Sequence, residues 1–234
     1  MTIRVVIPVY REEGIAALLA ELLSRPDAGA TRIVVVDGAP DRDTLARIPA
    51  ELATDPRLLL LASPPGRGVQ QNAGAAEADG DILLFLHADT LLPADAFTLI
   101  RRTMADPALS GGAFSLRYAE NSPGLSFIAA AANARSNFTR APYGDQAIFV
   151  RREVFRRLGG FRPLPLMEDL EFMTRLRRRG HSIRILAAPV RTSGRRQLRE
   201  GLLRCTLRNL ALRLLYHLGV PPGLLAGLYR RHGN

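Results

Sequence analysis

Four short apolar segments alternate with stretches of helical periodicity over the first ninety residues. These segments are rich in valine, isoleucine and leucine and cover residues 3–10, 31–38, 56–63 and 80–89. The helical stretches between them cover residues 14–25, 44–52 and 68–78. Continuous apolar strands that alternate with helices are typical of a parallel sheet covered by helices on both faces. We therefore predict an α/β fold with a mostly parallel central sheet.

The second half of the chain has a less regular pattern. We expect further strands of a mixed sheet over residues 111–118, 143–155 and 181–190. Helical spacing predicts helices over residues 124–138 and 168–180 and one long, arginine-studded leucine helix over residues 194–216. The predicted organisation is one domain over residues 1–190, divided at residue 92, followed by a basic helical tail over residues 191–234.

Composition limits the classes of function. The formal net charge of +10 indicates an anionic partner, which could be a nucleic acid, a phosphorylated substrate or an anionic membrane surface. With Cys205 as the single cysteine, neither an internal disulfide nor a cysteine-based metal site is expected. The sequence shows neither a signal-peptide pattern nor an apolar run of about 18 residues. We therefore predict a cytoplasmic protein, with possible peripheral contact at the inner membrane face through the tail.

Polar and charged residues gather where the first four predicted strands end. Ligands of open α/β sheets bind at the carboxyl ends of the strands. After the fourth strand, Asp89 offers the hard oxygen ligand that Mg²⁺ or Mn²⁺ prefers, and His87 lies on the same side of the chain. Alone, Asp89 could equally cap the next turn. Arg67 lies in a glycine-rich stretch that opens a helix, where backbone amides could face an anion.

The succession of these motifs carries a family resemblance. "VVIPVYREE", "IVVVDGAPD", "GRGVQQNAGAAEADGDILLFLHADT", "GGF" and "MEDLEF" resemble the GT-A fold nucleotide-diphospho-sugar transferases of glycosyltransferase family 2. The likeness covers roughly residues 1–190 and implies a nucleotide-sugar-binding half over residues 1–92 and an acceptor half over residues 93–190. "HADT" in place of Asp-x-Asp, with the later "SGRR", resembles a bacterial subgroup often linked to arsenosugar biosynthesis.

The resemblance implies a role for each matching residue. Asp89 would bind a divalent metal, Mg²⁺ or Mn²⁺, and Asp169 would be the general base with Glu168 beside it. Asp37 would read the base of the nucleotide, although the family often has Asp-Asp-Gly-Ser where this chain has Val36-Asp37-Gly38-Ala39. The other expected donor-binding residues are Pro8, Tyr10, Glu12, Arg67, Asn72 and His87. Asp145 and Gln146 could bind acceptor hydroxyls, or could simply form a turn between strands.

The chemistry of sugar transfer needs the same types of residue. The anomeric C–O bond breaks through an oxocarbenium-like state, and a cation must stabilise the departing diphosphate. A carboxylate must also take the proton of the acceptor hydroxyl. We therefore expect an inverting, metal-dependent glycosyltransferase that uses a nucleotide-sugar donor and a small-molecule or lipid-linked acceptor.

Three other functions compete with this interpretation. A nucleic-acid-binding module would fit the positive net charge. However, aromatic residues make up only 6% of the chain, and the pattern of aromatic residues interleaved with basic ones, on which bases stack, is not visible. Nucleic acid is therefore not expected as a partner. A nucleotidyltransferase would need an early Gly-x-Gly loop, whereas this chain has "PVYREEG". An inactive sugar-nucleotide binder is disfavoured because Asp89 and Asp169 are both present.

The tail helix could lie on a membrane, on a second subunit or on its own domain, and we expect it to be dispensable for donor binding.

Overall fold

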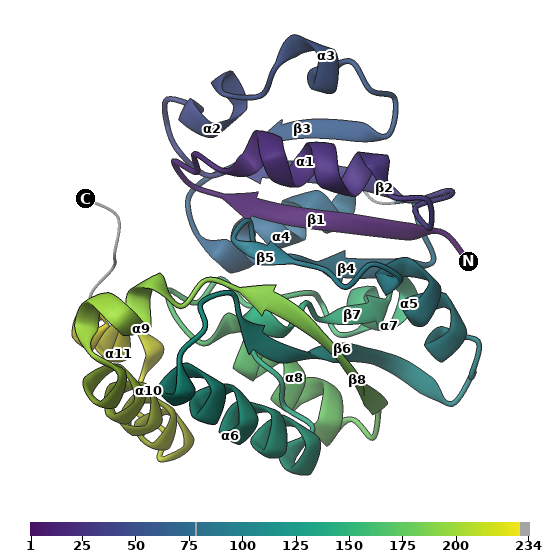
Figure 1. Ribbon diagram of the computed structural model, residues 1–234. Helices are drawn as coiled ribbons and strands as arrows, with labels where there is room; N and C mark the ends of the chain where they lie inside the picture. Colours follow the sequence, from purple (N-terminus) through teal and green to yellow (C-terminus); the bar gives the residue numbers. More distant parts are fainter. Residues whose placement is uncertain (78, 230–234) are drawn as a thin grey trace.

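The computed structural model describes residues 1–77 and 79–229, and its strands form one sheet in the order β3-β2-β1-β4-β7-β6-β8-β5 (Figure 1). The strands are β1 (Ile3–Val9), β2 (Arg32–Asp37), β3 (Leu58–Ala62), β4 (Ile82–Phe85), β5 (Thr90–Leu91), β6 (Leu109–Tyr118), β7 (Phe149–Arg151) and β8 (Ser182–Thr192). Four of the seven strand pairings are parallel, and the antiparallel ones are β4 with β7, β6 with β7, and β5 with β8. The predicted α/β fold with a mostly parallel sheet is confirmed.

Helices cover both faces of this sheet (Figure 1). In the first half they are α1 (Ile15–Ser24), α2 (Asp43–Ala46), α3 (Ala50–Ala53), α4 (Arg67–Ala76) and α5 (Ala96–Met104). In the second half they are α6 (Pro123–Thr139), the 3₁₀ turn η1 (Gly144–Gln146), α7 (Arg152–Arg157), α8 (Glu168–Arg178), α9 (Arg195–Glu200), α10 (Leu202–His217) and α11 (Pro222–Leu228).

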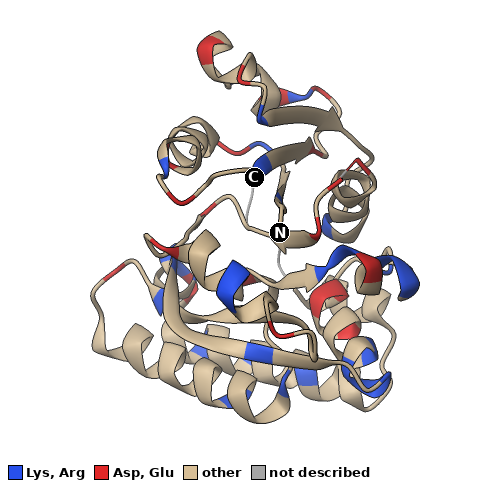
Figure 2. Cartoon of the chain, turned by 90° about the vertical axis from the view of Figure 1, so that its right-hand side faces the viewer, with Lys and Arg blue, Asp and Glu red and all other residues tan. Residues whose placement is uncertain are grey.

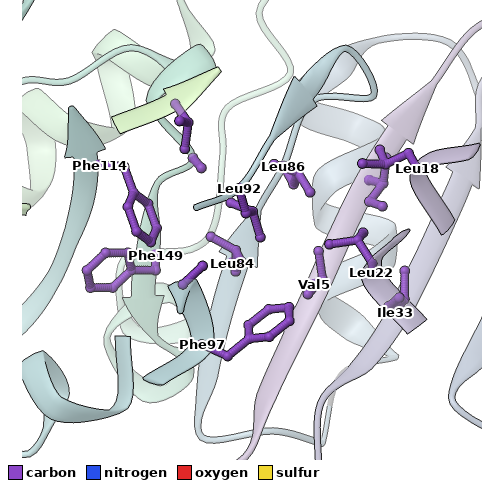
Figure 3. Packing of buried hydrophobic residues seen from close by; sticks show 14 of the residues in the cluster. Val5, Leu18, Leu22, Ile33, Leu84, Leu86, Leu92, Phe97, Phe114 and Phe149 are labelled. Atoms are coloured by element: carbon purple, nitrogen blue, oxygen red, sulfur yellow. The ribbon is translucent and has the colours of Figure 1, made fainter. Parts of the chain in front are cut away.

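The helices bury one apolar core on each face of the sheet. Figure 3 shows the first, where Leu18 and Leu22 of α1 and Phe97 of α5 pack against strand residues such as Val5 and Leu84. The second core lies under α4, α7 and α8, and its aromatic centre is Phe85, Phe155, Phe161 and Phe172. Central strands buried on both faces explain why the apolar runs in the sequence are continuous.

The glycines of the "GRGVQQNAGAA" stretch serve packing. A Cβ atom on Gly74 would lie 2.5 Å from Cγ1 of Val6, so glycine allows α4 to lie directly on β1. Further along the same helix, Gln70 donates its side-chain N–H to the carbonyl oxygens of Val9 and Val36, at 2.7 and 2.8 Å. This side chain therefore ties together the ends of β1 and β2, next to the site described below.

Several predicted elements differ from those observed. Residues 143–155, expected to be one strand, form the turn η1, the short strand β7 and the first part of the helix α7. The strand cannot run through Ala147, which adopts a left-handed conformation (φ 48°). The later apolar residues, Val154, Phe155 and Leu158, have helical spacing. The helix expected over 44–52 is broken before Pro49, whose ring disfavours helical conformation in the preceding residue. Helix α5 was not predicted. The tail helix is divided at Gly201 (φ 87°), and residues 78 and 230–234 lie outside the described part of the chain.

Charge and hydropathy bear on the expected partners. In the view of Figure 2, segments with lysine or arginine occur in both the upper and the lower part of the molecule, and segments with aspartate or glutamate lie among them. Within residues 1–77 and 79–229, no helix is both long enough and apolar enough to cross a lipid bilayer.

Candidate active site

A cavity of about 260 Å³ opens beyond the carboxyl end of β4. Its lining comes from segments far apart in the sequence: the start of α4, the residues after β4, the turn η1, the start of α8 and the tail. Six of the predicted site residues line it: Arg67, His87, Asp89, Asp145, Glu168 and Asp169. The fold therefore brings together the predicted phosphate-binding cation, the predicted metal ligand and the predicted base.

An ion pair joins the predicted donor-binding and catalytic residues. Nη1 of Arg67 lies 3.2 Å from Oε1 of Glu168, whose side chain is buried. Burial raises the pKa of the Glu168 carboxyl, although the charge of Arg67 opposes that rise. The guanidinium of Arg67 remains half-exposed, so it can bind an anion in the cavity while Glu168 holds it in place.

Asp169 lies at the start of α8, and two backbone amides, one from η1 and one from α8, hold its carboxylate. Its Oδ2 accepts the N–H of Gly144 at 2.6 Å, and its Oδ1 accepts the N–H of Leu170 at 2.7 Å. Met167, the residue directly before α8, adopts a left-handed conformation (φ 66°) that a side chain makes costly. Such a backbone, supported by its surroundings, fixes the direction in which Asp169 faces the cavity.

Gly144 allows His87 and Asp169 to approach the turn η1. A Cβ atom on Gly144 would lie 2.7 Å from Nε2 of His87 and 3.3 Å from Oδ2 of Asp169. We expect Gly144→Ala to fold normally but to lower the sugar-transfer rate by about 10²-fold, because displacement of a reacting group by about 1 Å can cost that much. Steady-state kinetics would measure the change.

Gly223→Ala is the matched control, since a Cβ atom there meets no heavy atom within 4 Å. Its activity should equal that of the unaltered protein. An active Gly144→Ala protein would show that the positions of His87 and Asp169 tolerate displacement, and would contradict their role in the reaction.

Three of the cavity-lining residues each have a buried polar atom without a hydrogen-bond partner among the described residues: Nε2 of His87, Oδ1 of Asp145 and Oε1 of Gln197. Burial, followed by the charge of Arg67, lowers the pKa of His87 to about 3, so this imidazole is neutral near pH 7. Burial, followed by the charge of Asp169, raises the pKa of Asp145 to about 6. Unpartnered buried polar atoms are costly, and a ligand that hydrogen-bonds to them would remove that cost.

Asp89 is exposed at the mouth of the cavity, and Thr90 Oγ1 lies 3.4 Å from its Oδ1. Among residues 1–77 and 79–229, no group of three or more histidine, cysteine or acidic side chains is arranged to hold a metal ion. This arrangement fits Mg²⁺-like ions that take one or two carboxylates from the protein and the remaining ligands from a diphosphate and water. Asp89 is the residue that would hold such an ion.

The tail forms one wall of the cavity. Arg196 and Gln197 of α9, Asn209 and Leu212 of α10, and Tyr229 all line it. Gln197 donates a hydrogen bond to the hydroxyl of Tyr118 at 2.9 Å, and Arg196 lies 4.0 Å from the centre of the Tyr229 ring. The expectation that the tail is dispensable for donor binding is therefore withdrawn, because the tail completes the cavity that contains Arg67.

Two residues predicted to bind ligands make structural hydrogen bonds within the protein. Gln146 is fully buried, where its Oε1 accepts the hydroxyl of Ser136 at 2.6 Å and its N–H reaches the carbonyl oxygen of Phe114 at 3.0 Å. Asn72 bonds both backbone groups of Phe161, at 2.7 and 2.9 Å, and so joins α4 to the segment before α8. Neither side chain lines the cavity. Their roles in ligand binding stay predictions.

We expect Asn72→Ala to lower the free energy of unfolding by about 1–3 kcal/mol, because it leaves the buried backbone N–H and C=O of Phe161 without partners. Donor affinity should stay unchanged. Chemical denaturation and donor titration would test the two statements. Asn137→Ala, at an exposed asparagine that bonds only within α6, is the control and should change stability by less than about 0.5 kcal/mol. A large loss of donor affinity in Asn72→Ala would support its predicted binding role.

The residues predicted to bind the nucleoside do not line the cavity. Asp37 is fully buried, and its two oxygens accept the backbone N–H groups of Ala39, Thr44 and Leu45 at 2.8, 3.0 and 3.2 Å. In this structure Asp37 therefore shapes the loop after β2. Pro8 is half-buried, Tyr10 is exposed and Glu12 accepts the N–H of Gly14. Their role in nucleoside binding stays a prediction.

The cavity also contains residues that the sequence did not point to. They are two aromatic side chains, Tyr118 at the end of β6 and Tyr143 before η1, together with Thr192 at the end of β8 and Ser193 after it. The sequence offered a weak signal for the last pair, since the "SGRR" segment begins at Ser193. The tyrosines carried none, because a tyrosine at a strand end is compatible with simple packing.

Comparison with known proteins decides the family. Residues 4–159 match the domain described as glycosyl transferase family 2. The chain belongs to this family. An N-acetylglucosaminyltransferase of Bradyrhizobium elkanii is 32% identical over 111 residues, which cover 45% of this chain and 61% of that protein. A second N-acetylglucosaminyltransferase, from Bradyrhizobium diazoefficiens, is 34% identical over 122 residues, or 50% of this chain and 25% of that protein.

Solved structures support the fold. Residues 1–349 of S. aureus TarS superimpose with a TM-score of 0.63 at 17% identity, covering 92% of this chain and 66% of that one. Mannosyltransferase PcManGT from Pyrobaculum calidifontis, in complex with GDP-Man and Mn²⁺, gives a TM-score of 0.60 at 25% identity over 80% of this chain and 54% of that one. The predicted GT-A fold is confirmed. The chain spans between a quarter and about three fifths of the two curated relatives named above.

Family membership also decides between the competing functions. It favours a glycosyltransferase over a nucleotidyltransferase or a nucleic-acid-binding module. The comparisons do not bear on the arsenosugar subgroup, which stays a prediction from the "HADT" and "SGRR" motifs.

Proposed function

We propose that this chain transfers a sugar from a nucleotide-diphospho-sugar donor to an acceptor hydroxyl, with inversion at the anomeric carbon. The observation that carries the proposal is the juxtaposition, in one cavity of a family 2 chain, of Arg67, Asp89 and Asp169. These side chains supply a cation for the departing diphosphate, a hard ligand for a metal ion and a separate carboxylate for the acceptor proton.

Arg67 faces the charge that develops on the leaving group. The transition state is oxocarbenium-like, and negative charge accumulates on the departing diphosphate oxygens. Because Glu168 holds Arg67 in place, the guanidinium needs little reorganisation when that charge appears. A divalent metal held by Asp89 would neutralise part of the same charge when bound.

Asp169 takes the proton of the acceptor hydroxyl in this proposal. The two backbone amides that hold its carboxylate set its direction, and Asp145 and His87 lie on the same side of the cavity. The unpartnered Oδ1 of Asp145 and Nε2 of His87 are suited to hydrogen bonds with sugar or acceptor hydroxyls. An inverting reaction follows from a base that acts on the acceptor and forms no bond to the sugar.

The curated relatives suggest which donor to test first. They are N-acetylglucosaminyltransferases, and one TarS structure is a complex with UDP-GlcNAc. We propose UDP-GlcNAc as the first candidate donor and a small-molecule or lipid-linked alcohol as the acceptor.

A thermal-shift panel of nucleoside diphosphates and nucleotide sugars, with and without Mn²⁺, tests donor binding. We expect a rise in Tm that is larger with Mn²⁺ and selective for one nucleotide base. Release of the nucleoside diphosphate, measured with the stabilising donor, separates an active enzyme from an inactive binder. A panel without any stabilising nucleotide would overturn the proposal.

A further inference from the structure

Two helices each expose a row of apolar side chains to solvent. On α6, Phe127 and Phe138 are 75% and 91% exposed, and Ala131 and Ala134 between them are exposed as well. On α10, the exposed row consists of Leu203, Leu207, Leu210 and Leu214, each at least 56% exposed. Both rows follow the spacing i, i+4, i+7, i+11, which places each row on one face of its helix.

The two helices lie side by side and run in the same direction (Figure 1). Near their N-termini, a Cβ atom on Gly124 would lie 2.4 Å from the side chain of Leu202. Eleven residues further along each helix, the guanidinium groups of Arg135 and Arg213 lie 3.7 and 5.8 Å from the centre of the same Tyr143 ring. Two contacts with the same offset require parallel neighbours in register.

This register places both apolar rows on the same side of the pair. An α-helix turns by about 100° per residue. Measured around each helix axis from the side that contacts the other helix, each apolar row is rotated by roughly 60–110°. The rotation on α6 and the rotation on α10 have opposite senses. For parallel neighbours, such rotations point to one common face. The opposite faces are buried, through Leu125, Ala129 and Ser136 of α6 and Cys205 and Leu212 of α10. The two rows therefore form a single outer surface, the α6/α10 surface.

The charge of the α6/α10 surface has one sign. Neither helix contains an aspartate or a glutamate, and their four charged residues are all arginines. Among them, Arg204 is exposed at the outer edge of α10. A further arginine, Arg140, follows α6 directly and is exposed as well. An apolar face bordered by arginines is complementary to a surface that is apolar inside and negative outside.

We propose that the α6/α10 surface docks on an anionic lipid bilayer, with both helices lying in the plane of the interface. Leucine and phenylalanine side chains would enter the acyl boundary while the arginines meet lipid phosphates. A second copy of the chain fits less well, because two-fold pairing through this surface would bring its arginines against one another. The surface lies outside the cavity, so the proposal does not depend on the sugar-transfer reaction.

Vesicle co-sedimentation tests the proposal with the full chain. We expect the protein to sediment with vesicles that contain phosphatidylglycerol, to bind pure phosphatidylcholine vesicles more weakly, and to be partly released by salt. The double substitution Leu207→Gln/Leu210→Gln should weaken binding to the anionic vesicles by about tenfold or more, since two exposed leucines lose their burial. Arg204→Gln should weaken it less and reduce the salt dependence.

Leu59→Gln, at an exposed leucine of β3 far from the tail in sequence, is the matched control and should bind as the unaltered protein does. Circular dichroism and thermal melting establish that each variant is folded. Three results would overturn the proposal: no binding to anionic vesicles, unchanged binding of the double variant, or a concentration-dependent dimer that the double variant abolishes. The last result would assign the surface to a second copy of the chain.

Discussion

Asp169→Asn should lower the rate of sugar transfer by about 10²–10⁴-fold while leaving donor affinity unchanged. That range is the usual contribution of a positioned general base. The amide side chain cannot accept the acceptor proton. It has nearly the same size but keeps only one acceptor oxygen for the two backbone N–H groups that bond Asp169, so circular dichroism and thermal melting must establish that the variant is folded. Donor titration and single-turnover transfer with the donor identified by thermal shift would measure the two quantities separately.

Two neighbouring acids serve as controls for this assignment. Glu168→Gln removes the charge that holds Arg67, so its effect should fall mainly on donor affinity and be smaller on turnover. Asp145→Asn probes a further carboxylate in the cavity, whose raised pKa of about 6 also suits proton transfer near neutral pH. A larger loss of turnover in Asp145→Asn than in Asp169→Asn would move the base to Asp145. Equal losses of affinity and rate in Asp169→Asn would make that residue a binding or structural one.

Asp89→Asn should abolish the contribution of Mn²⁺ to donor binding. Loss of a residue that only orients a metal ligand typically costs 10–100-fold in metal affinity, so loss of a ligand itself should cost on the order of 100-fold or more. Isothermal titration with a nucleoside diphosphate, with and without Mn²⁺, would show the change. Because Asp89 is exposed and accepts only a long contact from Thr90, the fold should be unaffected.

Asp41→Asn is the control for Asp89→Asn. Asp41 is an exposed carboxylate paired with Arg11 at the surface, outside the cavity, and its loss should not change metal-dependent binding. An Asp89→Asn protein that binds the nucleoside diphosphate as tightly as the unaltered protein in Mn²⁺ would show that the metal, if used, has another ligand.

The tail shows how one segment can be predicted correctly and still be misjudged. Its arginine and leucine pattern predicted a basic helix, and α9 and α10 are helical. The same pattern did not reveal that Gln197 and Asn209 face the cavity, because that depends on the contact between Gln197 and Tyr118, seventy-nine residues earlier. Periodicity describes the faces of a helix but not what each face meets.

The sequence by itself determined the α/β fold, the parallel strands β1–β4 and the positions of Arg67, Asp89 and Asp169 at the ends of elements. These features depend on local patterns: continuous apolar runs, helical spacing and polar residues where strands stop. Only the tertiary structure decided which groups Gln146, Asn72 and Asp37 bond within the protein, and that the tail lines the cavity. The physical reason is that burial and hydrogen bonding of a polar side chain depend on groups far away in the chain, and no local spacing encodes which of these groups will come within 3 Å of it.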